Sequence, residues 1–328
     1  MFIKSIKTTS AKTFRFLLNR FDCPAIILLY HRVINLKNDP HLLAVSPDNF
    51  SKHVKFLQEG YNLLSIDDFV RILKSQKSFP KKSVILTFDD GYGDNFTEAL
   101  PILESFKAQA LFYISTSNID SKQIFWWDEL AEIFLLNNKL PNNLEFSVNN
   151  KKFIFKTDTE HTLMQTHNSL HPILKNLNST TRQKLLDILH QWSGLKDLND
   201  SSHRVLNKNE IIKMSQSKSV VLGAHTHTHT KLSVLNYDEQ YQDIINSKKI
   251  LEKIAGQPIK HFSYPFGDRG DYNHDSLKIV QQLKFEMICA NYYGQVHRFS
   301  NIYNLPRVIV RNWDITQFKQ QINQYFTY

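Results

Sequence analysis

The sequence predicts an α/β protein, a distorted parallel β/α barrel interrupted by a mainly helical insertion. Short apolar runs alternate with helical patterns along most of the 328 residues. Several of these runs are apolar on both faces, as buried parallel strands are. A strand-then-helix rhythm is typical of parallel barrels, and only one stretch, residues 119–206, breaks it.

The N-terminal segment, residues 1–23, is predicted to form a basic amphipathic helix. Up to residue 21 it holds five basic residues and no acidic one, and six apolar residues fall near one face at helical spacing. This pattern fits a helix that lies on an anionic membrane and equally a helix that packs on its own barrel. No apolar stretch is followed by a small-residue cleavage site, so a secretory signal is not expected.

The barrel is predicted to occupy residues 24–118 and 207–328. Its helices carry capping signals, with Ser46 before one helix and Asn236 or Asp238 before another. The strands are predicted from eight apolar runs: Ala25–Tyr30, Tyr61–Ile66, Val84–Phe88, Ala110–Ile114, Val220–Gly223, His261–Tyr264, Phe285–Ala290 and Arg307–Val310.

The insertion, residues 119–206, is expected to combine helices with one hairpin and to shape substrate access. Two strand-like runs, Leu144–Val148 and Lys152–Phe155, flank a pair of asparagines, which is typical of a tight turn. Helical patterns surround the hairpin at Trp126–Asn137, His161–Leu177 and Thr181–Trp192.

Composition excludes several classes of protein. The longest apolar run near the N-terminus is far below the ~18 residues of a membrane-spanning helix. Two cysteines are too few for a disulfide framework or a cysteine zinc site. The net charge of +9 suits anionic partners. No helix-turn-helix or zinc-finger spacing accompanies it, and we therefore expect no nucleic-acid binding.

Two carboxylates, Asp89 and Asp90, follow the apolar strand that ends at Phe88. Burying adjacent carboxylates is costly unless a cation or other partner accompanies them. The following Gly91 permits a chain turn, so that one carboxylate could bind a metal while the other takes a proton from water. An Asp-Asp-Gly triplet also occurs as a simple turn.

Three histidines, His225, His227 and His229, follow the apolar run that ends at Gly223. Imidazoles are common ligands for zinc-like ions. A helical turn would place His225 and His229 on one face, and two histidines with one carboxylate leave open metal positions for hydrolytic chemistry. His227 would then point elsewhere.

Two further strand ends carry candidate groups. The turn Ser263–Gly267 could aim backbone N–H groups at a developing oxyanion. His31 follows the strand that ends at Tyr30 and has a pKa range suited to acid–base work, although a lone histidine is more often structural.

These motifs together resemble the polysaccharide deacetylases, the NodB-homology group or carbohydrate esterase family 4. The strings Thr87–Gly91 and His225–His229 match its paired motif. Three further strings resemble the poly-N-acetylglucosamine deacetylase branch: Leu29-Tyr30-His31-Arg32-Val33, Val45-Ser46-Pro47 with Phe50, and Tyr264-Pro265-Phe266-Gly267. The resemblance spans residues 24–118 and 207–311 and implies a NodB-type barrel.

The resemblance implies roles for matched positions. Asp89 would be the general base, and Asp90, His225 and His229 would be the metal ligands. The Phe266 backbone would help to hold the oxyanion, with Tyr264 next to it at the substrate.

The general acid and the charge beside Asp89 need other assignments. Family members usually end with a Leu-x-His motif, and no such motif closes this chain. In the named branch that histidine comes early, which matches Leu29 and His31, with His297 as the substitute candidate. The usual arginine before the Pro-aromatic-Gly turn is missing, and Arg307 could supply its charge. The string Phe125–Asp128 resembles a motif of relatives in surface-polysaccharide pathways, which brings Trp127 to the substrate.

The implied activity is hydrolytic N-deacetylation of an N-acetylated sugar in a surface polysaccharide or lipid-linked glycan precursor. It needs one divalent ion, zinc in the first place, with cobalt, nickel or iron also suited to the ligands. The absence of a signal favours a cytoplasmic location, peripheral on the inner membrane face if the N-terminal helix binds lipid. Two alternatives stay open: another metal-dependent amidohydrolase that uses His-x-His, and an inactive sugar-binding homologue.

Overall fold

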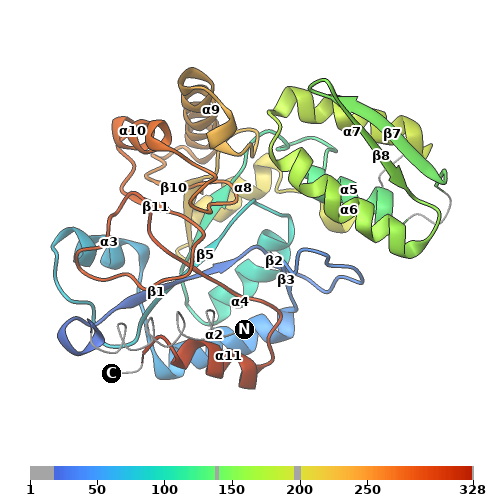
Figure 1. The fold of residues 1–328 in the computed structure, drawn as a ribbon. Helices are drawn as coiled ribbons and strands as arrows, with labels where there is room; N and C mark the ends of the chain where they lie inside the picture. The colour runs from blue at the N-terminus through green and yellow to red at the C-terminus, as the bar shows by residue number, and fades with distance from the viewer. Residues whose placement is uncertain (1–17, 137–139, 196–200, 327–328) are drawn as a thin grey trace.

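The computed structural model describes residues 18–136, 140–195 and 201–326. Its main sheet is wholly parallel and has the order β11-β10-β9-β6-β5-β1-β12, with β4 beside β5 (Figure 1). The strands are β1 (Ala25–Tyr30), β4 (Asn62–Leu63), β5 (Ser83–Phe88), β6 (Ala110–Ile114), β9 (Val220–Ala224), β10 (His261–Ser263), β11 (Met287–Cys289) and β12 (Val308–Ile309).

An irregular segment closes the two ends of this sheet into a ring. Leu305 donates its backbone N–H to Ile288 (2.8 Å) and accepts one from Ala290 (2.9 Å), so it runs along β11. Three residues later, Val308 pairs with Leu28 of β1. The predicted distorted β/α barrel is therefore confirmed, and the distortion lies where residues 302–309 pass from one edge strand to the other.

Alternate residues of the strands face two different cores. On β1, Ile26 and Leu28 pack outward against the helices, whereas Ala25 and Ile27 face the barrel interior. Both sets are fully buried. This two-sided burial explains why the strands appear in the sequence as continuous apolar runs.

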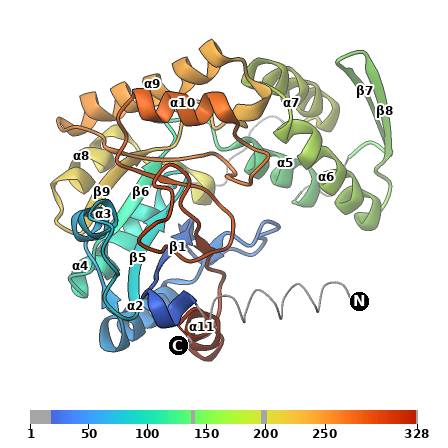
Figure 2. The same ribbon diagram turned by 60° about the vertical axis from the view of Figure 1, so that its left-hand side comes forward.

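Helices cover the outside of the ring (Figure 2). They are α2 (Pro47–Gly60), α4 (Leu100–Ser105), α8 (Lys208–Gln216), α9 (Tyr237–Ala255), α10 (His274–Gln282) and α11 (Ile315–Asn323). The helix α3 (Ile66–Lys74) packs instead against the interior core, where Phe69 and Leu73 join the cluster that holds Ile27. Ser46 caps α2 by accepting from Asn49 N–H, and of the two candidates for α9 the cap is Asn236. A π-helical turn, Asn95–Ala99, precedes α4.

One predicted strand is much shorter in the structure. The run Tyr61–Ile66 forms only the two-residue β4, because Ser65 caps α3 by accepting from Asp68 N–H and the helix begins at Ile66. A second small parallel pair, β2 (Arg32–Val33) with β3 (Ala44–Val45), was not predicted.

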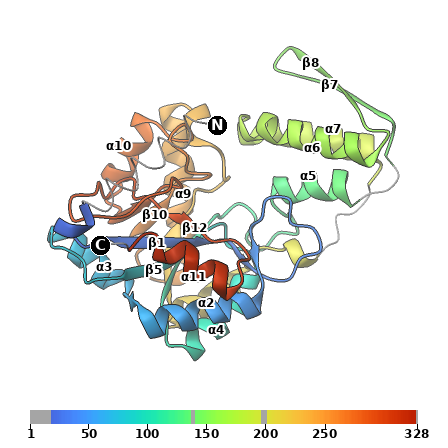
Figure 3. The same ribbon diagram turned by 60° about the horizontal axis from the view of Figure 1, so that its bottom comes forward.

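The inserted stretch forms a separate helical layer with a hairpin (Figures 1 and 3). It contains α5 (Trp126–Leu135), β7 (Asn143–Val148), β8 (Lys151–Lys156), α6 (Glu160–Lys175) and α7 (Ser179–Ser193). Asn149 and Asn150 both have positive φ, 50° and 61°, as a two-residue hairpin turn requires. The layer has its own core, in which α5 residues such as Leu130 pack against Leu170 and Leu186.

Most of the predicted N-terminal helix, residues 1–17, lies outside the described residues. The described remainder, residues 18–21, is helical, and Phe21 is 83% exposed. Within residues 18–136, 140–195 and 201–326, no helix is long and apolar enough to cross a bilayer.

Stability should fall in acid through His53, which is fully buried and stacked on Phe318 at 3.8 Å. Burial lowers the pKa of His53 to about 4 against 6.5 when exposed, so the unfolded chain binds the proton first as pH falls. We expect this residue to contribute a loss of about 3 kcal/mol in unfolding free energy between pH 6.5 and 4.

Urea denaturation at several pH values would measure this loss. The variant His53→Gln should have a shallower acid slope, whereas His161→Gln, at an exposed position, should keep the native slope. Parallel slopes for the native protein and His53→Gln would contradict the assignment.

Candidate active site

The candidate residues gather at the carboxyl ends of the parallel strands. His31 follows β1, Asp89 follows β5, His225 follows β9 and Ser263 ends β10. Along each strand, alternate side chains point into the barrel, and each of these four residues falls at such an inward position. A cavity of about 220 Å³ lies between these strand ends and is lined by His31, Asp89 and His225 together with Asp90, His229, Trp127 and Phe266.

A left-handed turn brings the second carboxylate to the same cavity. Strict alternation would send Asp90 to the outer side, but Asp90 and Gly91 have φ of 75° and 89°, and the chain turns back. A Cβ at Gly91 would lie 2.9 Å from the Ile114 side chain, so both the conformation and the space favour glycine. Asp-Asp-Gly is thus a turn, and the turn is what aims both carboxylates at one site.

Asp89 is held by Arg307 in a buried, two-pronged ion pair. The Arg307 Nη1 and Nη2 atoms lie 2.7 and 2.6 Å from the two Asp89 oxygens. Ser263 Oγ donates to Asp89 as well (3.2 Å). Burial alone would raise the pKa of Asp89, but the Arg307 charge lowers it below its ordinary value. The carboxylate therefore stays ionised and fixed in orientation, as the sequence-based assignment of Arg307 requires.

Asp90 lies between two imidazoles. Its Oδ1 atom is 3.4 Å from His225 Nε2 and 3.2 Å from His229 Nε2. Two ligand atoms on one tetrahedral zinc ion are roughly 3.3 Å apart, so the spacing fits a shared ion. Among the residues that the structure describes, Asp90, His225 and His229 form the one group of three or more metal-binding side chains with ligand atoms within 4.8 Å of one another.

The helical turn expected between the two histidines is wrong. Residues 225–230 form a loop in which Thr226 and His229 have φ of 62° and 48°. Thr226 Oγ accepts from His229 N–H (3.1 Å) and so braces the loop. A β-branched residue at positive φ is strained, and such strain is common at functional sites.

The proton arrangement on His225 favours a cation in this cluster. His225 Nδ1 lies 2.8 Å from the Ser263 carbonyl oxygen, which can only accept, so Nδ1 carries a proton. A neutral His225 then turns the lone pair of Nε2 towards the Asp90 carboxylate. Only a proton or a metal ion between these atoms makes the contact favourable. Metal-bound histidines typically have this kind of carbonyl partner, and the donor set therefore fits a divalent ion.

Phe266 contributes a strained backbone to the lining of the cavity. Its φ is 61°, and the next amide, Gly267 N–H, bonds back to the Pro265 carbonyl. No described residue accepts a hydrogen bond from Phe266 N–H, so this donor is available to a ligand. The Phe266 ring lies 4.9 Å from the His229 ring, and Lys175 lies over its face.

Trp127 lines the cavity, and its indole is held from behind. Its ring is 4.6 Å from His229, and its Nε1–H donates to Tyr92 Oη (2.7 Å), which in turn donates to Asp128 (2.7 Å). Sequence reasoning did not assign roles to Tyr92 and Asp128, although Tyr92 directly follows the Asp-Asp-Gly motif and Asp128 is the last residue of the Phe125–Asp128 string.

Three other candidates lie away from the cavity. Tyr264 is an outward residue of the β10 end, with its hydroxyl on the Tyr303 carbonyl, so its expected place at the substrate is wrong. His297 pairs with Asp22 near the start of β1 and cannot replace His31. His227 contacts Thr116 through Nδ1, which agrees with the expectation that it points elsewhere.

Removing Arg307 should reveal how strongly the buried pair couples. In Arg307→Met the Asp89 carboxylate stays buried without its cation, and we expect a loss of about 3–5 kcal/mol in unfolding free energy. In Asp89→Asn/Arg307→Met most of that loss should be recovered, because neither charge remains. A double-mutant cycle by urea denaturation measures the coupling, and simple additivity of the two single losses would contradict it.

Comparisons with known proteins agree with the fold and the strand-end motifs. A family model described as polysaccharide deacetylase matches residues 76–142 and 198–288. YxkH of Bacillus subtilis (strain 168), named as a polysaccharide deacetylase, is 21% identical over 285 residues, covering 87% of this chain and 70% of that protein. A poly-beta-1,6-N-acetyl-D-glucosamine N-deacetylase of Staphylococcus aureus (strain MSSA476) is 27% identical over 268 residues, 81% of this chain and 68% of that protein.

A solved structure has the same fold. The Streptococcus pyogenes deacetylase PplD, in complex with acetate, has a TM-score of 0.60 at 20% identity and covers 92% of this chain and 99% of its own. The family match and the catalytic motifs at the strand ends agree, and the chain belongs to the polysaccharide deacetylase family, the NodB-homology group of carbohydrate esterase hydrolases.

Proposed function

We propose that this chain is a metal-dependent N-deacetylase of an N-acetylated sugar in a surface polysaccharide. The observation that carries the proposal is the pairing of Asp89 with Arg307 directly beside the Asp90–His225–His229 cluster. The Staphylococcus relative is named for poly-beta-1,6-N-acetyl-D-glucosamine, and oligomers of this sugar are the first substrates to test. Two imidazoles and a carboxylate suit zinc, and also cobalt, nickel or iron.

The side chains divide the reaction between them. An ion held by Asp90, His225 and His229 would polarise the amide carbonyl and acidify water. Asp89 accepts the proton of the attacking water, and Arg307 keeps its carboxylate aligned. Phe266 N–H donates to the developing oxyanion.

His31 is assigned to protonate the leaving amine nitrogen. Burial lowers the pKa of His31, while the Asp90 and Asp89 carboxylates oppose this shift. The pKa of His31 stays below its ordinary value, so the assignment rests on position: His31 lines the same cavity as both carboxylates, as a proton donor to a group bound there must.

The alternatives receive less support. A His-x-His amidohydrolase site would use His227, but this ring contacts Thr116 and does not line the cavity. An inactive sugar-binding homologue would not need the carboxylate of Asp89 fixed in a buried ion pair, which is costly to keep.

We also propose a peripheral location on the inner face of the cell membrane. It is supported by five basic residues and no acidic one in residues 1–21 and by the exposed ring of Phe21. Each cation near an anionic surface contributes about 1 kcal/mol of attraction, which salt weakens. A lipid-linked precursor is the alternative substrate, and its glycan would have to be long enough to reach the end of β1 opposite Phe21, where His31 lies.

Separate readouts for metal and turnover should distinguish ligands from base. We expect Asp89→Asn to keep about one bound metal ion and to lose at least 10²-fold in acetate release, because only the proton acceptor is gone. His225→Ala and His229→Ala should lose the metal as well. Elemental analysis measures the bound metal, and an acetate assay on N-acetylglucosamine oligomers measures turnover. Turnover by Asp89→Asn at the native rate would show that Asp89 is not the general base.

Co-sedimentation with vesicles tests the membrane proposal. The native chain should bind anionic vesicles in low salt and bind neutral vesicles weakly. Replacing Lys4, Lys7 and Lys12 by glutamine should weaken this binding, whereas replacing Lys151, Lys152 and Lys156 of the hairpin should not. Equal binding of both variants, or none by the native chain, contradicts the proposal.

A further inference from the structure

Arg311 follows β12 and lines the catalytic cavity, but the catalytic scheme gives it no role. β12 pairs in parallel with β1, with Ile309 beside Leu29, and Val310 N–H donates to the Leu29 carbonyl (2.9 Å). Continuing this register sets Arg311 at the level of His31, on neighbouring strands that lie about 5 Å apart. Burial is the main cause of the lowered pKa of His31, and the charge of Arg311 contributes to it.

Arg311 is anchored by backbone oxygens through one of its nitrogens. Its Nη1 donates to the carbonyls of His41 (2.9 Å) and Leu42, in the loop between β2 and β3. No described residue accepts a hydrogen bond from its Nε or Nη2. These two nitrogens form one edge of the planar guanidinium, and such an edge binds two oxygens of a carboxylate or phosphate. The side chain is therefore held in place while its anion-binding edge has no protein partner.

Arg311 also lacks the acidic partner that the other cation lining the cavity has. Lys175 forms an ion pair with Asp271 (3.0 Å), whereas no described carboxylate pairs with Arg311. Asp268 lines the cavity too, but it is exposed and makes no ion pair with Arg311. Arg311 itself is half-buried. A charge taken partly out of water without an opposite charge is costly, and an anionic ligand would supply the missing charge.

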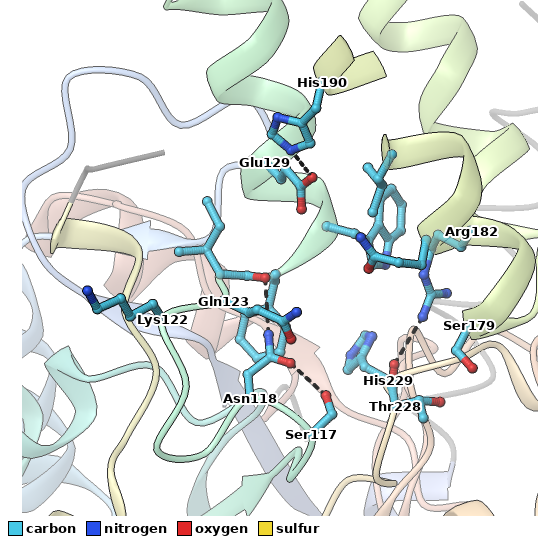
Figure 4. A pocket seen from close by; sticks show the side chains of 15 residues that line it. Ser117, Asn118, Lys122, Gln123, Glu129, Ser179, Arg182, His190, Thr228 and His229 are labelled. Carbon is cyan, nitrogen blue, oxygen red and sulfur yellow. Dashed lines mark hydrogen bonds and ion pairs between the residues drawn. The ribbon is translucent and has the colours of Figure 1, made fainter. Parts of the chain in front are cut away.

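Arg182 of α7 shows what a purely structural arginine looks like in this protein (Figure 4). It too has no acidic partner among the described residues, but it is only 5% exposed. It donates through Nη2 to the Thr228 carbonyl (3.0 Å) and to Thr230 Oγ (3.1 Å), which ties α7 to the loop that carries His229. The enclosed Arg182 braces the fold, whereas Arg311 lines a cavity of about 220 Å³ that the substrate must enter.

We propose that Arg311 binds an anionic group of the substrate, a carboxylate or a phosphate, on the reacting sugar or on the linkage next to it. The inference rests on the proposed deacetylase function and narrows its substrate class to acidic N-acetylated sugars. Two sources share this chemistry: an acidic sugar carries a carboxylate on its ring, and a sugar phosphate carries a phosphate ester at its anomeric carbon. The position of Arg311 beside His31 sets the anionic group close to the nitrogen that His31 protonates.

The test compares kcat/KM for acetate release from three sugars built on one ring: methyl N-acetylglucosaminide, its counterpart with a carboxylate at C6, and N-acetylglucosamine 1-phosphate. The native enzyme should favour one of the anionic sugars over the neutral one by about 10-fold or more, and the favoured sugar identifies the carboxylate or the phosphate as the ligand. In Arg311→Gln this ratio should fall towards one. Arg311→Lys should keep part of it, because lysine retains the charge but not the two-nitrogen edge.

The matched control is Arg269→Gln. Arg269 is exposed, lies over the Tyr292 ring and does not line the cavity, so its replacement should leave the native ratio intact. Thermal unfolding of Arg311→Gln checks the loop between β2 and β3. Asp39 also holds this loop by accepting from the N–H groups of Leu43 and Ala44, and we expect the loop to stay folded.

Binding measured without turnover separates the anion site from catalysis. In calorimetric titrations of Asp89→Asn with each anionic sugar, adding Arg311→Gln should weaken the tighter binding by about 10-fold. Equal kcat/KM for neutral and anionic sugars in the native enzyme, a native ratio in Arg311→Gln, or binding that does not depend on Arg311 would overturn the anion site and leave the deacetylase function intact. Arg311-dependent binding without acetate release from any of the sugars would instead refute the deacetylase function and support the anion site.

Discussion

Two adjacent carboxylates are buried at the end of one strand, and each needs a positively charged partner. The organisation of the site follows from the difference between these two partners. Asp89 takes its charge from Arg307, a fixed cation delivered by the segment that closes the barrel. Asp90 turns to two imidazoles, whose charge depends on protons or on a metal ion. Asp89 therefore has a permanently charged partner, whereas Asp90, its neighbour in the chain, is able to bind an ion.

Barrel closure and catalysis are consequently linked through Arg307. The residue sits between the part of the segment that pairs with β11 and the part that pairs with β1. Its Nε donates to the Ala290 carbonyl at 2.8 Å, so the guanidinium also holds the end of β11. The barrel is irregular at this point because the segment changes partners there, and that change brings the cation to Asp89.

A second buried cation links the barrel to the insertion. Arg32 donates to Asp94 and lies over the Tyr92 ring at 4.1 Å, and Tyr92 in turn holds Asp128 and Trp127. The wall of the catalytic cavity is therefore positioned by a chain of buried polar contacts that starts at the end of β1. Such fully connected networks hold one geometry, because breaking any member leaves a buried polar group without its partner.

The alternation of inward and outward side chains along each strand explains much of what could be predicted from the sequence. His31, Asp89, His225 and Ser263 all continue the inward positions of their strands, and the same rule would have sent Tyr264 outward, where the structure places it. The left-handed residues could not be predicted: Thr226 and His229 have conformations that their own side chains disfavour. They are imposed by contacts across the fold, such as Asp243 accepting from Thr228 N–H at 2.8 Å. Likewise, nothing local indicates that Arg182 reaches a loop more than forty residues away.

The helical turn at residues 18–21 determines how the molecule would be oriented on a surface that it contacts through this turn. Residues 18–21 immediately precede β1, whereas His31 follows its other end, and six strand residues span about 20 Å. A molecule resting on a surface through Phe21 would thus direct its catalytic mouth away from that surface. It would meet sugars that extend into the surrounding solvent, and a saccharide joined closely to a lipid headgroup would lie on the far side of the barrel.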